Sequence, residues 1–191
     1  MFVGANVPLY YSALQMRSRD FRVPDLLVVL EAEPKQERPF WVVWEEGGQR
    51  PNLVVEVVSP STEDQDRGAK MRIYSKVLAV PEYYIHDLQA GRLDGYTLDA
   101  KQAYVPIAAD DRGRLPSAQL GGAFGVVRER YDGHDAFWLR LFEADGRRSP
   151  TAAEFERERA ELERERAEAL AARLAEYERR FGVLDGQGCS K

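Results

Sequence analysis

The sequence LVVEVV at 53–58 is the feature that most restricts the fold. Five of its six residues are leucine or valine, and an unbroken apolar run of this kind is typical of a strand buried on both faces. A helix-forming segment follows at 62–78, where Thr62 and Gln65 match a capping box, and a short apolar run follows at 83–85. The order strand, helix, strand predicts a βαβ unit.

Glu56 interrupts this run at a position where a strand buried on both faces should carry an apolar residue. Because side chains alternate along a strand, Glu56 shares a face with Val54 and Val58. A lone buried carboxylate costs several kcal/mol. Glu56 must therefore be protonated, paired with a cation or bound to a metal ion.

Asp25, Asp66 and Lys70 are candidate partners for Glu56. Asp25 opens the apolar run DLLVVL, and its carboxylate converges with that of Glu56 if the two strands pair. Two carboxylates about 4 Å apart repel by roughly 4 kcal/mol at an effective dielectric near 20, a cost that a divalent cation turns into binding energy. Asp66 and Lys70 are four residues apart on the predicted helix, with Lys70 at the edge of the face that packs on the sheet.

Two interpretations of these four residues remain open. In the first, Lys70 only neutralises a buried Glu56, and Asp66 is an ordinary ion-pair partner of Lys70. In the second, Asp25 and Glu56 supply the hard oxygen ligands of Mg²⁺ or Mn²⁺, and Lys70 lies near an attacked phosphate.

The rest of residues 1–150 has the pattern of short strands separated by turns. Apolar runs predict strands at 26–30, 95–98, 104–108, 124–130 and 137–142, with hairpin-type connections at 98–101 and 132–133. The connection 31–52 contains the aromatic run PFWVVW, which predicts an extra strand or a flap.

Residues 151–181 differ in composition from the preceding domain. They are almost entirely Ala, Glu, Arg and Leu, with opposite charges three or four apart, which predicts a long solvated helix. Its later apolar residues follow a 4-3-4 spacing, namely Leu170, Leu174, Tyr177 and Phe181. Without a heptad pattern before them, this helix is either a short coiled coil that forms a homo-oligomer or a polar appendage. We expect a domain at 1–150, this helix at 151–181 and a flexible tail at 182–191.

Composition excludes several classes of protein. The net charge of −5 argues against a general electrostatic nucleic-acid binder, although the interspersed signs allow a local basic surface. Cys189 is the single cysteine, which excludes an internal disulfide and Cys-based zinc motifs. No apolar run reaches the roughly 20 residues that span a bilayer, and the N-terminus lacks the layout of a signal peptide. We expect an intracellular, cytoplasmic protein with no membrane partner.

The sequence lacks three common catalytic motifs but resembles one known family. P-loop, GxSxG and HExxH motifs are absent, so NTPase, α/β-hydrolase and zincin functions lack support. The chain instead resembles the Uma2 family of the PD-(D/E)xK, restriction-endonuclease-like superfamily. The residues that carry the resemblance, over roughly 21–145, are Val23-Pro24-Asp25, the run 54–62, Asp66, Lys70, Tyr74, Pro81-Glu82-Tyr83-Tyr84-Ile85 and Asp87.

This resemblance implies an α/β (α+β) fold with a mixed central β-sheet flanked by helices. It implies metal-dependent endonuclease activity on nucleic acid, with DNA as the expected substrate and Mg²⁺ or Mn²⁺ as the cofactor. Asp25 corresponds to the acid of the PD element and Glu56 to the acid of the (D/E)xK element, both as metal ligands. Val58 stands where the superfamily pattern has lysine, and Lys70 on the next helix takes that catalytic position, as in Uma2-like sequences.

The resemblance also implies secondary roles. Asp66 and Asp87 fall on positions of the family pattern as auxiliary residues: Asp66 would orient Lys70 or contact the metal through water, and Asp87 would take part or cap a turn. Tyr74 and Tyr83 are expected to pack around the site. His86 is an alternative base, although a strand-end histidine is more often structural.

Three arginines precede the PD element: Arg17, Arg19 and Arg22 would contact phosphates or lie on a solvated strand face. About twenty residues precede Asp25, where the family pattern has a further helix and strand, so the resemblance implies a trimmed domain. Two rival interpretations stay open. One is a catalytically silent nuclease fold that binds nucleic acid or a protein, and the other is an assembly protein whose acid cluster is a buried ion pair.

Overall fold

The structure is a computed structural model that describes residues 1–12, 21–34, 38–59 and 62–182. The chain forms two compact units, Met1–Arg148 and Ser149–Lys191, and each is described by itself. Arg17, Arg19 and the predicted tail beyond residue 182 lie outside the described residues.

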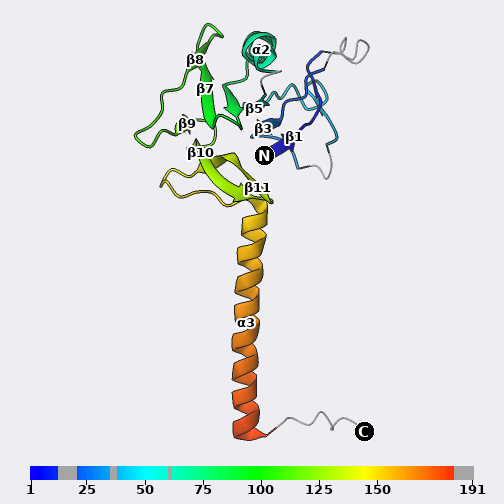
Figure 1. The fold of residues 1–191 in the computed structure, drawn as a ribbon. Coiled ribbons are helices and arrows are strands. Elements are labelled where there is room, and N and C mark those ends of the chain that lie inside the picture. Colours follow the sequence, from blue (N-terminus) through cyan, green and yellow to red (C-terminus); the bar gives the residue numbers. More distant parts are fainter. Residues whose placement is uncertain (13–20, 35–37, 60–61, 183–191) are drawn as a thin grey trace. The chain divides into compact units, whose positions relative to one another are not determined.

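The first unit is built on a six-stranded sheet with the strand order β1-β3-β5-β6-β7-β8 (Figure 1). Its strands are β1 (Phe2–Ala5), β3 (Leu26–Val29), β5 (Leu53–Val58), β6 (Glu82–Asp87), β7 (Arg92–Leu98) and β8 (Tyr104–Pro106). Strands β5 and β6 pair in parallel, and the other neighbours pair antiparallel. A helical segment connects the parallel pair, which confirms the predicted βαβ unit.

This helical segment covers 63–77 and is not a regular α-helix. It begins with α2 (Glu63–Gln65) and continues through two π-helical stretches, η1 (Asp66–Lys70) and η2 (Ile73–Val77). π-Helical turns are rare and occur frequently at functional sites. The helix therefore forms where the sequence predicts it, with an irregularity that the sequence pattern does not reveal.

The capping box predicted at the start of this helix does not form. Thr62 has φ −111° and ψ −15°, a helical conformation in which its side chain caps no helix N–H group. Its hydroxyl oxygen instead accepts a hydrogen bond from the backbone N–H of Ser59 at 3.1 Å. The side chain thus joins the end of β5 to the start of the helix, and the prediction that pairs Thr62 with Gln65 is wrong.

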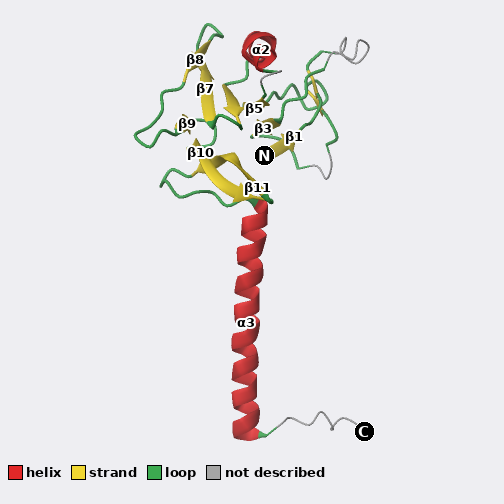
Figure 2. Ribbon diagram, viewed as in Figure 1, coloured by secondary structure: helices red, strands yellow, loops and turns green. Residues whose placement is uncertain are grey.

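The two faces of the large sheet pack against different layers, as Figure 2 shows. The helical segment covers one face, where Val54 and Val58 of β5 meet a core that includes Tyr74. A second sheet, with the order β11-β10-β9, covers the other face, where Leu53 and Val55 pack. Its strands are β9 (Leu115–Ser117), β10 (Gly122–Tyr131) and β11 (His134–Phe142). The alternation predicted for 53–58 is confirmed, and Glu56 faces the helix.

The aromatic run in the connection 31–52 forms a short extra strand, β4 (Trp41–Val42). It pairs in parallel with β2 (Leu9–Tyr10), and the Trp41 indole is fully buried. The residues before the PD element therefore contribute both β2 and the sheet-edge strand β1 to the fold.

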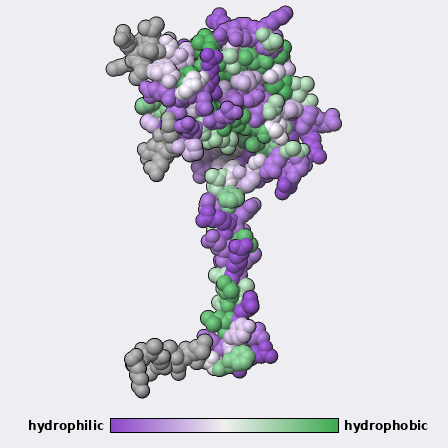
Figure 3. Space-filling view, turned by 180° about the vertical axis from the view of Figure 1, so that it is seen from behind, coloured by the Kyte–Doolittle hydropathy of each residue, from purple (hydrophilic) through white to green (hydrophobic). Residues whose placement is uncertain are grey.

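The second unit contains α3 (Ala152–Phe181), which begins at Thr151 with a capping box completed by Glu154. The helix buries none of its residues, and its surface is mainly hydrophilic with separate apolar side chains (Figure 3). Ion pairs three and four residues apart, such as Arg164 with Glu168, run along it. The predicted long solvated helix is confirmed, whereas its self-association stays a prediction.

Among the described residues, no helix combines the length and the apolar composition needed to cross a membrane.

Candidate active site

Glu56 lies at the centre of the candidate site, in the middle of β5 and with no exposed surface. Strands β3 and β6 pair with β5 on its two sides, and the helical segment packs on the face that Glu56 shares with Val54 and Val58. The Tyr74 hydroxyl donates a hydrogen bond to Glu56 Oε1 at 2.8 Å, and Lys70 Nζ lies 3.0 Å from Glu56 Oε2. One phenol and one ammonium thus hold the two oxygens of this carboxylate.

The Lys70 ammonium is shared between two buried acids. It lies 2.7 Å from Asp66 Oδ1, and the Asp66 residue is 1% exposed. The Lys70 side chain is 23% exposed, so it reaches the buried acids from the rim of the site. The Tyr83 hydroxyl donates a hydrogen bond to the backbone carbonyl of Asp66 at 3.0 Å, which fixes this helical turn over β6.

For each of Glu56 and Lys70, burial and contacts with opposite charges shift the pKa in opposite directions. Burial raises the pKa of Glu56 to about 7, against the lowering effects of Lys70 and the Tyr74 hydrogen bond, and the charge of Asp25 adds to the rise. Burial lowers the pKa of Lys70, but its contacts with Asp66 and Glu56 outweigh burial and raise it overall. Lys70 therefore stays charged at neutral pH, where Glu56 exchanges a proton.

Asp25 directly precedes β3, the strand that pairs with β5, and lies across from Glu56. Leu26 pairs with Val55 in the antiparallel β3–β5 register, so the next position in that register sets Asp25 across from Glu56. Asp25 Oδ2 accepts a hydrogen bond from the backbone N–H of Val57 at 2.7 Å. The structure therefore puts the predicted residues Glu56 and Lys70 in contact, pairs the predicted auxiliary residue Asp66 with Lys70, and sets the predicted Asp25 beside β5.

The donor set fits a divalent ion with two carboxylate ligands. Among the described residues, no group of three or more His, Cys, Asp or Glu side chains is arranged to hold a metal. Mg²⁺, however, is usually bound through one or two carboxylates, completed by water and substrate phosphate. Glu56 Oε2 and Asp66 Oδ1 are buried, and both lie next to the Lys70 ammonium, at 3.0 and 2.7 Å.

Two other predicted candidates lie apart from this cluster. Asp87 ends β6, and its Oδ1 accepts hydrogen bonds from the N–H groups of Gln89 and Ala90 at 3.0 and 2.8 Å, so it caps a turn. His86 lies on the other face of β6, where its Nε2 is 2.7 Å from the carbonyl oxygen of Phe137. A base at His86 would therefore be separated from Glu56 by the sheet.

One further buried acid, Glu82, was noted in the sequence only as part of the family pattern and without a role. Glu82 at the start of β6 is 2% exposed and accepts hydrogen bonds from the Ser117 hydroxyl at 2.6 Å and the Ala118 N–H at 2.7 Å. These bonds tie the large sheet to the second sheet. The only available signal was a glutamate directly before the apolar run 83–85.

A cavity of about 430 Å³ opens beside Lys70. Six residues from two segments line it: Phe21, Arg22, Val23, Gln65, Ala69 and Lys70. Arg22 is the described member of the three arginines noted before the PD element, and it reaches the site.

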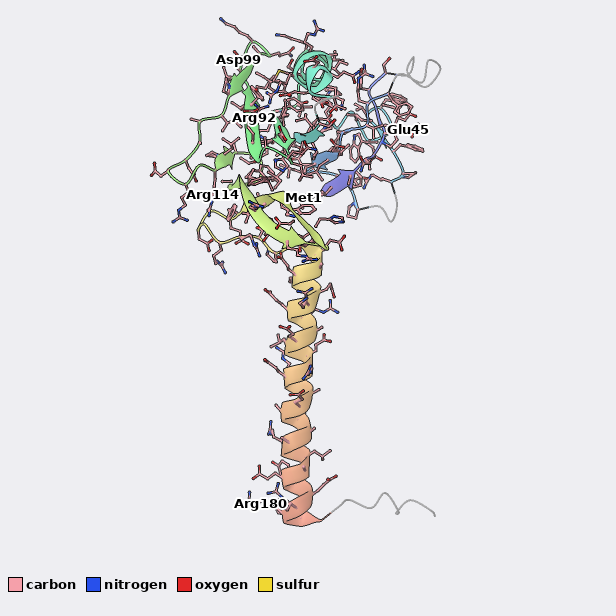
Figure 4. The ribbon with its side chains drawn as sticks, in the orientation of Figure 1. Met1, Glu45, Arg92, Asp99, Arg114 and Arg180 are labelled. Carbon is pink, nitrogen blue, oxygen red and sulfur yellow. The ribbon has the colours of Figure 1, made fainter. Side chains whose placement is uncertain are left out.

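A second ion cluster lies on the same helical segment. Arg67 contacts Glu63 at 2.8 Å and Asp94 at 2.5 Å, and Arg92 contacts Glu63 at 2.7 Å. Arg92 projects from β7, as labelled in Figure 4. These side chains are between 30% and 50% exposed, so this second cluster is solvated.

The sheet with its parallel β5–β6 pair and the acid–lysine cluster agree with the comparison to known families. The model of the Uma2 family, described as "Putative restriction endonuclease", matches residues 1–127. The chain belongs to the Uma2 family. The match begins at Met1, not near residue 21, and ends at residue 127 rather than near 145. It includes β1 and β2, so the described residues before Asp25 belong to the matched region.

Membership of the Uma2 family indicates a restriction-endonuclease-like fold. A relative is the uncharacterized protein slr1290 of Synechocystis sp., which is 29% identical over 114 residues. This alignment covers 59% of the present chain and 56% of the relative, so the chain spans about half the length of the curated relative it matches.

Proposed function

We propose that this Uma2 protein is a metal-dependent endonuclease that hydrolyses phosphodiester bonds of nucleic acid, with DNA as the expected substrate. The observation that supports this proposal most directly is the fully buried Glu56, opposite Asp25 and in contact with a lysine that also contacts Asp66. A structural ion pair needs one acid and one base. Two carboxylates in contact with one ammonium, with Asp25 beside the same strand, leave an excess of negative charge that suits a divalent cation.

In the proposed mechanism, Asp25 and Glu56 hold Mg²⁺ or Mn²⁺. The ion, when bound, supplies a water molecule of lowered pKa and neutralises charge on the scissile phosphate. The Lys70 ammonium stabilises the negative charge that develops on the phosphate oxygens. Asp66 holds Lys70 in place, and the Tyr74 hydrogen bond fixes the orientation of Glu56.

Protonation of Glu56 competes with metal binding in this proposal. Burial raises the pKa of Glu56 to about 7, so a metal ion must displace a proton at mildly acidic pH. Lys70, by contrast, keeps its charge across the same range because its pKa is raised. Metal affinity, and with it cleavage, is therefore expected to fall as the pH drops below about 7.

The alternative is a nuclease fold that binds nucleic acid without cutting it. Glu56 Oε2 already has an ionic partner in Lys70, and no group of three metal-ligating side chains exists among the described residues. Both observations also suit a purely structural ion pair. Metal dependence separates the two functions.

The test is cleavage of supercoiled plasmid and of single-stranded DNA in Mg²⁺, Mn²⁺ or EDTA. Glu56→Gln, Asp25→Asn and Lys70→Ala are each expected to reduce metal-dependent cleavage by about 100-fold or more. The matched control is Arg67→Ala, which removes a cation from the same helical segment but not from Glu56, and should leave cleavage unchanged. If the folded wild type binds DNA in EDTA, binds no Mn²⁺ and cuts no substrate, the binding-module function replaces the nuclease.

A further inference from the structure

The cavity beside Lys70 has no role in the mechanism described above. Phe21, Arg22 and Val23 line it from the segment that leads into Pro24-Asp25. Gln65, Ala69 and Lys70 line it from the helical segment. The two walls therefore come from the same two segments that carry Asp25 and Asp66, and the cavity adjoins the proposed catalytic lysine.

The lining combines an aromatic ring with two cations. The Phe21 ring is supported by Tyr10, with ring centroids 5.1 Å apart, and Tyr10 in turn meets Phe40 edge-on at 6.3 Å. A ring that is supported in this way is a fixed platform. Arg22, whose Nη1 donates a hydrogen bond to the Phe21 carbonyl oxygen at 3.0 Å, and Lys70, whose ammonium also contacts Glu56 and Asp66, bring cationic groups to the lining. A volume of about 430 Å³ is in the range of small-ligand pockets. Aromatic platforms beside cations are typical of sites for unpaired nucleotides, whose bases stack while their phosphates meet the cations.

The distribution of charge disfavours a duplex as the first-bound form. Duplex binding depends on Lys and Arg side chains that neutralise many phosphates, and this chain has a net charge of −5. Many described cations of the first unit are already paired with acids, namely Arg38, Arg67, Lys70, Arg92, Arg128, Arg140, Arg147 and Arg148. Stacking of an unpaired base on an aromatic ring adds binding free energy that does not come from phosphate contacts.

We propose that this cavity binds one unpaired nucleotide, with its base stacked on Phe21 and its phosphate next to Arg22 and Lys70. The inference deepens the proposed nuclease function and rests on it for the chemistry that follows binding. It names the substrate class as single-stranded nucleic acid, with the nucleotide in the cavity adjacent to the bond that is cut.

The test measures binding separately from cleavage. Fluorescence anisotropy in EDTA, at about 0.1 M salt, compares a labelled single-stranded DNA of ~12 nucleotides with the duplex of the same sequence. We expect the single strand to bind at least about tenfold more tightly. Phe21→Leu should weaken its binding by about tenfold, whereas Phe21→Trp, which keeps an aromatic face, should restore it. Trp44→Leu is the matched control, because Trp44 is 40% exposed and does not line the cavity.

The outcomes separate this inference from the nuclease proposal. Equal affinity for single strand and duplex, or unchanged binding by a Phe21→Leu variant with a wild-type melting curve, overturns the nucleotide cavity and leaves metal-dependent cleavage untouched. Tight binding of the single strand that requires Phe21, without cleavage in Mg²⁺ or Mn²⁺, supports the cavity and rejects the nuclease. An Arg22→Gln variant that keeps full affinity would remove Arg22 from the phosphate contact and overturn that part of the inference.

Discussion

The helical segment after β5 carries two acid–base pairs with the same spacing in two different environments. Asp66 and Lys70 are four residues apart, and so are Glu63 and Arg67. The side chain of Asp66 is 2% exposed and that of Glu63 is 36% exposed. The two pairs have the same i,i+4 spacing in the sequence, where only the predicted sheet-facing position of Lys70 distinguishes them, and the structure shows that they differ in burial.

The difference in burial between the two pairs shows which charges lower the stability of the folded protein and are kept nevertheless. A solvated ion pair such as Glu63–Arg67 contributes little, because water already screens both charges. Burying Glu56 and Asp66 costs several kcal/mol per ion, which Lys70 only partly offsets. An apolar residue at position 56 would make a more stable strand, so this acid is better explained by function than by stability.

The largest expected effect comes from removing the shared cation. Lys70→Met leaves two buried acids without their ammonium, and we expect it to lower the free energy of unfolding by about 3–5 kcal/mol at about pH 8. Urea unfolding followed by circular dichroism measures this change. The matched substitution Arg67→Met should cost much less. Equal losses for the two variants would show that the buried cluster is no different from the solvated one.

The second-largest expected effect is a change of the unfolding free energy with pH, caused by the titration of Glu56. Its pKa is raised from the usual 4.5 to about 7, so the folded state binds a proton that the unfolded state releases between these values. The contribution of Glu56 to stability is therefore fully present below about pH 4.5 and is lost as the pH rises to about 7, by roughly 3 kcal/mol in total.

Glu56→Gln isolates this contribution from the other titrating groups. The difference in unfolding free energy between the wild type and this variant should change with pH only between about 4.5 and 7. Urea titrations at several pH values measure it. A constant difference across this range would mean that Glu56 stays ionised in the folded protein, held by Lys70.

Whether a feature of the site could be predicted from the sequence depends on how far apart the interacting residues lie along the chain. Glu56 and Lys70 were predictable because a carboxylate in an apolar strand and a lysine on the following helix are local signals. The convergence of Asp25 with Glu56 was predictable only if their strands paired, which is a long-range event that the β3–β5 register satisfies. The Tyr74 hydrogen bond was not predicted, since the π-helical turns that set its direction leave no sequence pattern.

Elements of the fold that depend on long-range pairing could likewise not be predicted from the sequence. The βαβ unit follows from short-range hydrophobic patterns. Strand β9 has three residues and includes Pro116, so it lacks a pattern of its own, and pairing with β10 creates it. The failure of the Thr62 capping box has a similar cause, because the Ser59 N–H takes the hydroxyl that the helix would otherwise use.

The smallest expected effect comes from removing the solvated cation Arg67. Arg67 contacts Glu63 and Asp94 from a side chain that is 30% exposed, so Arg67→Met should lower the unfolding free energy by about 1 kcal/mol or less. Because salt screens exposed charges, this loss should nearly vanish at about 1 M NaCl, whereas the loss caused by Lys70→Met should persist. Urea unfolding of both variants at low and high salt measures the contrast. A salt-independent loss at Arg67 would mean that its contacts act through packing of the guanidinium stem rather than through charge, and the contrast between the two pairs would then be one of shape as well as of solvation.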